Sequence, residues 1–254
     1  MITRKFGWKP DLPDIRDHLF CKVAYPIITK ALPKVVDLRP GCSPVEDQGG
    51  TGSCTANALA GCLEYLLLKD KIPFTDLSRL FIYYNERALE GSTTFDNGAV
   101  LRDGIKTLAK EGACTEALWP YDETKALVKP IDTCYTEATK RLITSYSRLN
   151  TLDEMKHCLA AGFPFVFGFT VYDSFMDDSC MKRGRADMPK PGDKAQGGHA
   201  VCCVGYTDTS KRFIIRNSWG PKVHNKGYFT MPYEYLTDRN LSDDFWTIKA
   251  GTGL

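Results

Sequence analysis

One cysteine in this chain stands where its thiol could act as a nucleophile. The segment from Gln48 to Thr55 reads Gln-Gly-Gly-Thr-Gly-Ser-Cys-Thr, and an apolar pattern with helical spacing begins at Cys54. Glycine tolerates positive φ and lets another backbone come close, so the loop is expected to be shaped and accessible. Cys54 would then lie in the first turn of a helix, where unpaired N–H groups and the helix dipole favour a thiolate. The same position also suits a small buried residue, because free cysteine is often buried.

A thiolate needs a proton acceptor, and the chain has only four histidines. His18 lies among charged residues and His157 lies in the middle of a helical pattern beside a lysine, so we interpret both as surface residues. His224 falls in a Pro-Lys-Val-His-Asn-Lys turn and is expected to be an exposed loop residue. His199 differs, because two glycines precede it and an apolar strand pattern follows it. His199 is therefore the candidate base.

A side-chain amide stands where it could orient that base. Asn217 ends the apolar pattern over 213–216 and is followed by Ser218, Trp219 and a glycine. The amide oxygen could accept a hydrogen bond from the His199 imidazole and fix its tautomer and ring plane. The Trp219 indole would keep water away from this bond. The residue types therefore suggest a nucleophile, a base and an orienting amide.

Composition argues against several other classes of function. The chain has 254 residues, of which 43% are hydrophobic and 25% are charged, so it can form one large domain or two tightly packed lobes. A net charge of +2 gives no basic surface of the kind that nucleic acid binding requires. The chain contains no run of 18 apolar residues, so the sequence indicates no membrane span. No apolar core of signal-peptide length is visible near the first residue. We therefore expect no nucleic acid or membrane partner, and the compartment stays open.

Ten cysteines are many for a chain of this length. No two of them are separated by the two residues of a Cys-x-x-Cys pair, so a zinc site is not expected. A disulfide framework is not expected either, because no signal peptide is visible and reducing compartments keep thiols free. We interpret most of the cysteines as core residues and expect no metal or other cofactor.

The elements that must position the candidate residues divide into a helical half and a β-rich half. Helices are predicted to begin at Cys54 and to cover 78–90, 100–110 and 151–161. Strands are predicted over 35–38, 142–149, 164–172, 199–206, 213–217, 228–231 and 245–249, with a long loop over 179–198. An α+β body of two lobes with a cleft between them follows, with a helical lobe at about 54–130 and a β-rich lobe at about 131–250.

The first 34 residues are interpreted as an extended arm. They are rich in proline and charge, and they lack both helical and strand periodicity. The apolar residues expected to anchor the arm on the body are Trp8, Leu12, Ile15, Leu19 and Phe20.

The candidate residues resemble one family. The order and separation of Gln48-Gly-x-x-Gly-Ser-Cys54, Gly198-His199-Ala200-Val201, Asn217-Ser218-Trp219-Gly220 and Gly227-Tyr228 are similar to those of papain-like cysteine peptidases. The resemblance covers about residues 32–251, and the segment 96–121 looks most like the bacterial-type branch. It implies a papain-like fold, with a helical left lobe that carries the nucleophile and a β-barrel-like right lobe that carries the base. A peptide or protein substrate would lie extended in the cleft between them.

The resemblance also implies a role for each candidate residue. Cys54 would attack the peptide carbonyl to form a thioester, His199 would transfer the protons, and Asn217 would orient His199. The Gln48 side chain and the Cys54 backbone N–H would hold the oxyanion. Gly98 and Ala99 would offer backbone hydrogen bonds to an extended peptide. The remaining substrate-binding positions would be Val100, Leu101 and Ala200 at the main specificity pocket, together with Gly198 and Trp219.

Specificity and regulation can be read in part from the same resemblance. A hydrophobic side chain two residues before the cleaved bond is expected, although Asp243 or Asp244 could close the pocket and admit a basic side chain instead. The arm is far shorter than the usual proregion of the family. We hypothesise that it covers the cleft and inhibits the enzyme within the same molecule.

The chain departs from the family pattern at four positions. Thr51 and Asp96 stand where the family commonly has two bonded cysteines, Thr55 replaces the aromatic residue after the nucleophile, and Val223 replaces a tryptophan. Two other classes of function stay open. One is a Cys-His acyltransferase or deamidase on the same scaffold, and the other is a binding protein without turnover.

Overall fold

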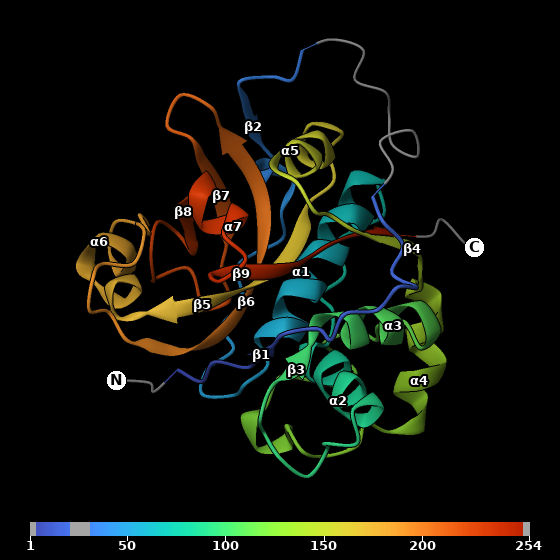
Figure 1. Ribbon diagram of the computed structural model, residues 1–254. Coiled ribbons are helices and arrows are strands. Elements are labelled where there is room, and N and C mark those ends of the chain that lie inside the picture. The colour runs from blue at the N-terminus through green and yellow to red at the C-terminus, as the bar shows by residue number, and fades with distance from the viewer. Residues whose placement is uncertain (1–3, 21–30, 251–254) are drawn as a thin grey trace.

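The computed structural model describes residues 4–20 and 31–250, and its helices and sheet lie side by side (Figure 1). The helices are α1 (Cys54–Lys69), α2 (Arg79–Leu89), α3 (Leu101–Lys110), α4 (Asp132–Ala138), α5 (Leu152–Ala160), α6 (Asp178–Met181) and α7 (Tyr233–Thr237). The strands are β1 (Trp8–Lys9), β2 (Val35–Asp37), β3 (Ala99–Val100), β4 (Ile143–Arg148), β5 (Phe165–Tyr172), β6 (Ala195–Thr207), β7 (Arg212–Arg216), β8 (Tyr228–Pro232) and β9 (Ser242–Ala250). Short 3-10 helices cover Arg39–Gly41, Glu123–Lys125, Thr139–Arg141 and Asp173–Met176.

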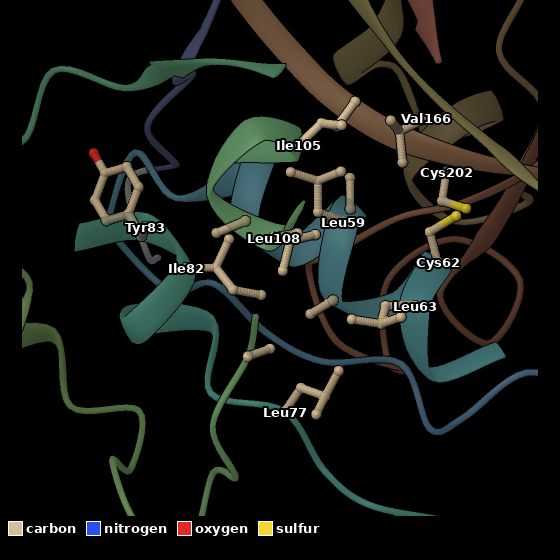
Figure 2. Packing of buried hydrophobic residues seen from close by; sticks show 14 of the residues in the cluster. Leu59, Cys62, Leu63, Leu77, Ile82, Tyr83, Ile105, Leu108, Val166 and Cys202 are labelled. Carbon is tan, nitrogen blue, oxygen red and sulfur yellow. The ribbon is translucent and has the colours of Figure 1, made fainter. Parts of the chain in front are cut away.

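Helix α1 is the central element, and Figure 1 shows it between the sheet and helices α2 and α3. Its residues are buried from Cys54 to Leu67, because small and apolar side chains occupy all its faces. Leu59 points toward Ile105 and Leu108 of α3 (Figure 2). On the other side, the sulfur of Cys62 faces that of Cys202 on β6. Helix α1 therefore packs against both the helices and the sheet.

The sheet positions the candidate base and amide next to each other. Its seven strands are antiparallel in the order β4-β9-β5-β6-β7-β8, with β2 paired to β6. Phe169 of β5 lies opposite His199 of β6, and Cys202 of β6 lies opposite Arg216 of β7. Because Asn217 directly follows Arg216, this register brings Asn217 back toward the first half of β6. Sheet pairing thus joins two residues that are 18 positions apart.

The arm is held on the body by backbone pairing and by buried charge. Strand β1 pairs with β3 in parallel, and the Ala99 N–H donates to the Gly7 carbonyl at 2.8 Å. The buried Asp11 carboxylate accepts from the Trp246 indole N–H at 2.8 Å. Arg148 contacts Asp11 at 3.2 Å and Asp244 at 2.8 Å. Burial raises the pKa of both carboxyl groups, that of Asp244 to about 7, and the Arg148 guanidinium acts against this rise.

Most of the predicted helices and strands are confirmed. Ser78 caps α2 by accepting the Phe81 N–H, and Thr151 and Glu154 form a capping box at the start of α5. The predicted loop over 179–198 is wrong at both ends, because α6 covers its first residues and β6 begins at Ala195. The glycines before His199 do not interrupt the strand, since β6 pairs with β5 along this stretch. The division into lobes at about residue 130 stays a prediction.

The expected arm anchors are only partly correct. Trp8 and Phe20 are buried, whereas Leu12, Ile15 and Leu19 are exposed. The chain holds this part of the arm by charge instead, because Asp11 and Asp17 pair with Arg102 and Arg148. Apolar composition alone therefore did not identify which residues face the body.

Replacing Arg148 with alanine should lower the free energy of unfolding by about 3 to 5 kcal/mol, because two buried carboxylates would lose their shared cation. Urea unfolding followed by tryptophan fluorescence measures the change. Arg16→Ala is the matched control, since the Arg16 side chain is 83% exposed and pairs with Asp14 on the surface. This change should leave the free energy of unfolding nearly unchanged, because exposed ion pairs contribute little. Equal losses in the two variants would contradict a structural role for the buried charges.

Candidate active site

The Cys54 thiol lies at the junction of α1 and β6. Cys54 is the first residue of α1 and is completely buried. Its Sγ accepts the backbone N–H of Ala200 at 3.4 Å. Since Ala200 follows His199 in β6, the thiol lies beside the strand segment that carries the candidate base. The start of α1, where unpaired N–H groups are available, is the location expected from the sequence.

The His199 imidazole is oriented by the Asn217 amide. His199 Nε2 lies 2.8 Å from Asn217 Oδ1, which also accepts the Ser218 backbone N–H at 2.8 Å. An amide oxygen can only accept, so Nε2 carries the hydrogen and Nδ1 keeps a lone pair. Among the described residues, His199 Nδ1 has no hydrogen-bond partner. The Trp219 ring lies 4.9 Å from the imidazole at an angle of 31°. The ring nitrogen with the lone pair is therefore available as a base.

Burial keeps both groups neutral in this arrangement. It raises the pKa of the Cys54 thiol to about 11, although backbone hydrogen bonds from Ala200 and Gly7 act in the opposite direction. Burial also lowers the pKa of His199 to about 4, against the hydrogen bond to Asn217. Near pH 7 the site therefore holds a thiol and a neutral imidazole. A thiolate would need either water or a charge that this closed arrangement excludes.

The Gln48 amide points at the arm. Its Nε2 donates to the Lys5 carbonyl at 3.2 Å and to the Thr51 carbonyl at 2.9 Å. Its Oε1 accepts the Ser218 hydroxyl at 2.7 Å, which fixes the amide so that its donor faces the arm. The Lys5 carbonyl therefore occupies the donor that the sequence analysis assigned to an oxyanion.

Residues 4–9 of the arm run along the site. The Phe6 ring lies 6.2 Å from the His199 ring and 6.3 Å from the Trp219 ring. Gly7 packs so closely that a Cβ on it would lie 1.8 Å from the Gly52 carbonyl oxygen, so only glycine fits there. Arg4 pairs with Asp47 and lies over the Trp219 ring. The arm thus covers the thiol, the imidazole and the Gln48 donor together.

Trp8 fills the region predicted to be the main specificity pocket. Its indole packs on Gly168 and Gly198, where any Cβ would collide with the ring or with the Trp8 backbone. The indole N–H donates to Asp244 Oδ2 at 3.0 Å. Asp244 is completely buried, whereas the Asp243 side chain is 36% exposed and pairs with Arg148 and Arg239. Of these two carboxylates, only Asp244 is buried and bonded to the Trp8 indole.

The other predicted substrate-binding residues lie in different environments. Ala99 pairs with the arm through its backbone, and Gly98 touches Gly7 while its own N–H donates to the Tyr83 hydroxyl at 3.2 Å. The Val100 N–H donates to Glu90 at 2.7 Å. Leu101 is fully buried in the helical core. Ala99 and Gly198 therefore contact the arm, whereas Leu101 lies in the core.

His224 is part of the site, and its prediction as an exposed loop residue is wrong. It is buried, with Nδ1 2.8 Å from the Cys180 carbonyl oxygen and Nε2 2.7 Å from Asn217 Nδ2. Its φ of +58° and its backbone N–H, which donates to the Met181 carbonyl at 2.8 Å, fold the turn inward against α6. A polar turn gives no periodic signal from which this burial could be read. His18 is exposed, as predicted.

Polar contacts occupy the positions at which the chain departs from the family pattern. Asp96 accepts the Gly52 N–H at 2.9 Å and the Tyr83 hydroxyl at 2.6 Å, and it pairs with Lys5. The Thr55 hydroxyl donates to the buried Glu86 carboxyl group. The cysteine loop is therefore braced by hydrogen bonds at both of these positions.

Three other features bear on the described ranges, namely metal clusters, disulfides and membrane-spanning helices. Within the described residues, 4–20 and 31–250, no group of three or more His, Cys, Asp or Glu side chains could hold a metal ion. The nine cysteines in these ranges are free, and Cys21 lies outside them. No helix in this part of the chain is long and apolar enough to cross a membrane.

Comparisons with known proteins agree on one family. Residues 32–243 match the model of the papain family cysteine proteases. The crystal structure of xylellain, a cysteine protease from Xylella fastidiosa, is 46% identical with a TM-score of 0.89, and the match covers 98% of each chain. An uncharacterised peptidase C1-like protein of Acanthamoeba polyphaga mimivirus is 42% identical over 99% of this chain and 88% of its own length.

A more distant structure supports the fold alone. The procathepsin B of Trypanosoma congolense is 16% identical with a TM-score of 0.78, and the match covers 98% of this chain and 87% of that one. The similarity to xylellain confirms the predicted resemblance to bacterial members of the family. The chain therefore has a papain-like fold and belongs to the papain family of cysteine proteases.

Proposed function

We propose that this protease is an endopeptidase in which Cys54 is the nucleophile, His199 the base and Asn217 the residue that orients the base. The observation that carries the proposal is the 2.8 Å contact between His199 Nε2 and Asn217 Oδ1, beside a thiol at the start of a helix. This contact leaves the other ring nitrogen of His199 with a lone pair and no partner among the described residues. A nucleophile, a base and an orienting group are the parts that covalent hydrolysis requires.

The proposed reaction has two halves. His199 Nδ1 takes the proton of the Cys54 thiol, and the thiolate sulfur attacks the carbonyl carbon of the peptide bond. The carbon–nitrogen bond then breaks, His199 returns the proton to the leaving amine, and a thioester remains on Cys54. Water gives a proton to His199 and attacks the thioester. The carbon–sulfur bond breaks, the acid product leaves, and His199 returns its proton to the Cys54 sulfur.

The oxyanion of each half is assigned to two donors. These are the Gln48 side-chain N–H and the Cys54 backbone N–H at the start of α1. The Ser218 hydroxyl supports the first assignment, because it holds Gln48 Oε1 and leaves Nε2 as the group that faces the cleft. One such donor contributes about 3 to 4 kcal/mol to the stability of the transition state in comparable sites.

Replacing Cys54 with alanine should reduce kcat/KM for a fluorogenic peptide at least about a thousandfold, because no nucleophile remains for the first half of the reaction. Hydrolysis is followed by fluorescence, and thermal unfolding checks that the variant is folded. Cys42→Ala is the matched control, since Cys42 is a half-buried thiol bonded to the Leu38 carbonyl and should leave activity unchanged. Activity that survives the Cys54 change would refute the mechanism.

Two other functions would use the same site differently. An acyltransferase or deamidase would form the same thioester but would pass the acyl group to another acceptor or act on a side-chain amide. Adding a primary amine to the assay separates these reactions, because a transferase would give the amide product in place of the acid. A binding protein without turnover would retain peptide and release nothing.

We further propose that the arm blocks the cleft. The arm occupies the Gln48 donor with the Lys5 carbonyl, covers His199 with Phe6 and fills the pocket with Trp8. The side-chain contacts that hold this segment include those of Arg4 with Asp47, Lys5 with Asp96, Lys9 with Glu90, and Trp8 with Asp244. A peptide substrate would have to displace residues 4–9 before it could reach Cys54.

Loosening the arm should make Cys54 more reactive. In the chain with Arg4→Ala and Phe6→Ala, water reaches the thiol, and its pKa should fall because burial is what raises it. Alkylation of the parent by iodoacetamide should rise only as pH approaches about 11, whereas the variant should react at least about tenfold faster at pH 8. Mass spectrometry of the Cys54 peptide measures both rates. Arg16→Ala is the control, because Arg16 pairs with Asp14 outside residues 4–9, and equal rates in all three chains would show that the arm serves stability only.

The pocket that holds Trp8 supports a hydrophobic preference two residues before the cleaved bond. In a library of fluorogenic peptides, large apolar and aromatic side chains at that position should give kcat/KM values about tenfold or more above small polar ones. The carboxylate of Asp244, which now accepts the indole N–H, allows a second outcome in which Arg or Lys is preferred. The absence of any preference at this position would contradict the assignment of the pocket.

A further inference from the structure

We propose that His224 is a positioning residue for the reaction, because its ring fixes which face of the Asn217 amide points at His199. This inference rests on the proposed roles of His199 and Asn217. It concerns the contact between His224 Nε2 and Asn217 Nδ2, which measures 2.7 Å.

The His224 ring is held in a closed aromatic environment. It stacks on Trp219 at 5.7 Å and 24°, and it packs against Phe229 at 5.1 Å and Phe175 at 5.9 Å. Trp219 lies in the turn after β7, Phe229 lies on β8, and Phe175 lies in the 3-10 helix after β5. The position of the ring is therefore set by several elements.

The tautomer of His224 follows from its neighbours. Nδ1 lies 2.8 Å from the Cys180 carbonyl oxygen, which can only accept, so Nδ1 carries a hydrogen. Burial also lowers the pKa of His224 to about 4, and the nearby Arg4 guanidinium acts in the same direction. The ring is neutral near pH 7, and its Nε2 presents a lone pair to Asn217.

That lone pair decides the orientation of the amide. Only the Asn217 NH₂ group can donate to it, so the Asn217 oxygen must face His199 Nε2 and the Ser218 N–H. The flipped amide would oppose its oxygen to the His224 lone pair and its NH₂ group to the Ser218 N–H. The two buried histidines are thus linked through one amide. A hydrogen on His224 Nδ1 leaves a lone pair on Nε2, this lone pair orients the Asn217 amide, and the amide oxygen then requires a hydrogen on His199 Nε2.

Two substitutions separate this role from simple packing. His224→Asn keeps a donor near the Nδ1 position but removes the acceptor for Asn217, and asparagine tolerates the positive φ of this residue. His224→Gln can place its amide oxygen near the former Nε2 position. Both are made in the full chain that carries Arg4→Ala and Phe6→Ala, so that the arm does not limit turnover.

We expect His224→Asn to lower kcat about tenfold while KM changes less than about twofold, and we expect His224→Gln to recover most of the loss. In a chain that also carries Asn217→Ala, the His224→Asn change should have no further effect on kcat, because His224 acts through that amide. A similar loss with and without Asn217, or no recovery by glutamine, would overturn the proposal. His157→Asn is the control, since His157 bonds to Asp153 on the surface and should leave kcat unchanged.

A measurement on the unsubstituted chain keeps the proposal testable if the variants fail to fold. Two-bond ¹⁵N–¹H spectra distinguish the tautomers of neutral histidines. They should show His224 protonated on Nδ1 and His199 protonated on Nε2, and the opposite tautomer of either ring would overturn the proposal. The Cys54→Ala experiment above tests the proposed function separately, because it does not depend on the state of His224.

Discussion

The packing of α1 against β6 is the contact on which the site depends. Successive residues of β6 face opposite sides of the sheet, so Ala200, Cys202 and Val204 join the core around α1, while Val201 and Cys203 join the aromatic core on the other side. His199 lies on the side of Val201, beside Phe169 and Trp219. A shift of one residue in the register of β6 would exchange the two faces. It would move the imidazole away from Asn217 and the Ala200 N–H away from the thiol.

Burial has two opposite effects at this site. It suppresses the charges that chemistry requires, since it raises the pKa of Cys54 and lowers that of His199. It also fixes the neutral tautomers, because each ring nitrogen that faces a carbonyl or amide oxygen must carry the hydrogen. With the arm closed, the Cys54 thiol and the His199 imidazole are therefore neutral, and Asn217 already orients the imidazole. In the proposed mechanism, opening the arm would admit water to the thiol while Asn217 keeps its hydrogen bonds to His199 and His224.

The elements and the candidate residues Cys54, His199 and Asn217 could be predicted from local patterns, whereas the proposed role of Gln48 came from the family resemblance and the remainder of the site could not be predicted. Gln48, Cys54, His199 and Asn217 stand in short segments whose composition marks a loop, a helix start and two strand ends. The burial of His224 depends on how a polar turn folds against α6, and no local pattern encodes that contact. The arm shows the same limit, because its apolar residues at 12, 15 and 19 are exposed while Asp11 is buried by partners more than 90 residues away.

Asp244 links the position of the arm to the shape of the pocket. The same carboxylate accepts the Trp8 indole N–H and the Asp11 backbone N–H, and it pairs with Arg148. In the proposed pocket, a substrate that displaces Trp8 would remove one of these donors and would leave the Asp244 carboxyl group, still in contact with Arg148, at the bottom. Because a buried carboxylate that loses a donor becomes less stable, side chains that can donate a hydrogen bond gain an advantage over purely apolar ones of the same size. If the arm blocks the cleft and Trp8 fills the specificity pocket, as proposed, Asp244 would couple specificity to arm release, and a change at Asp244 would alter both.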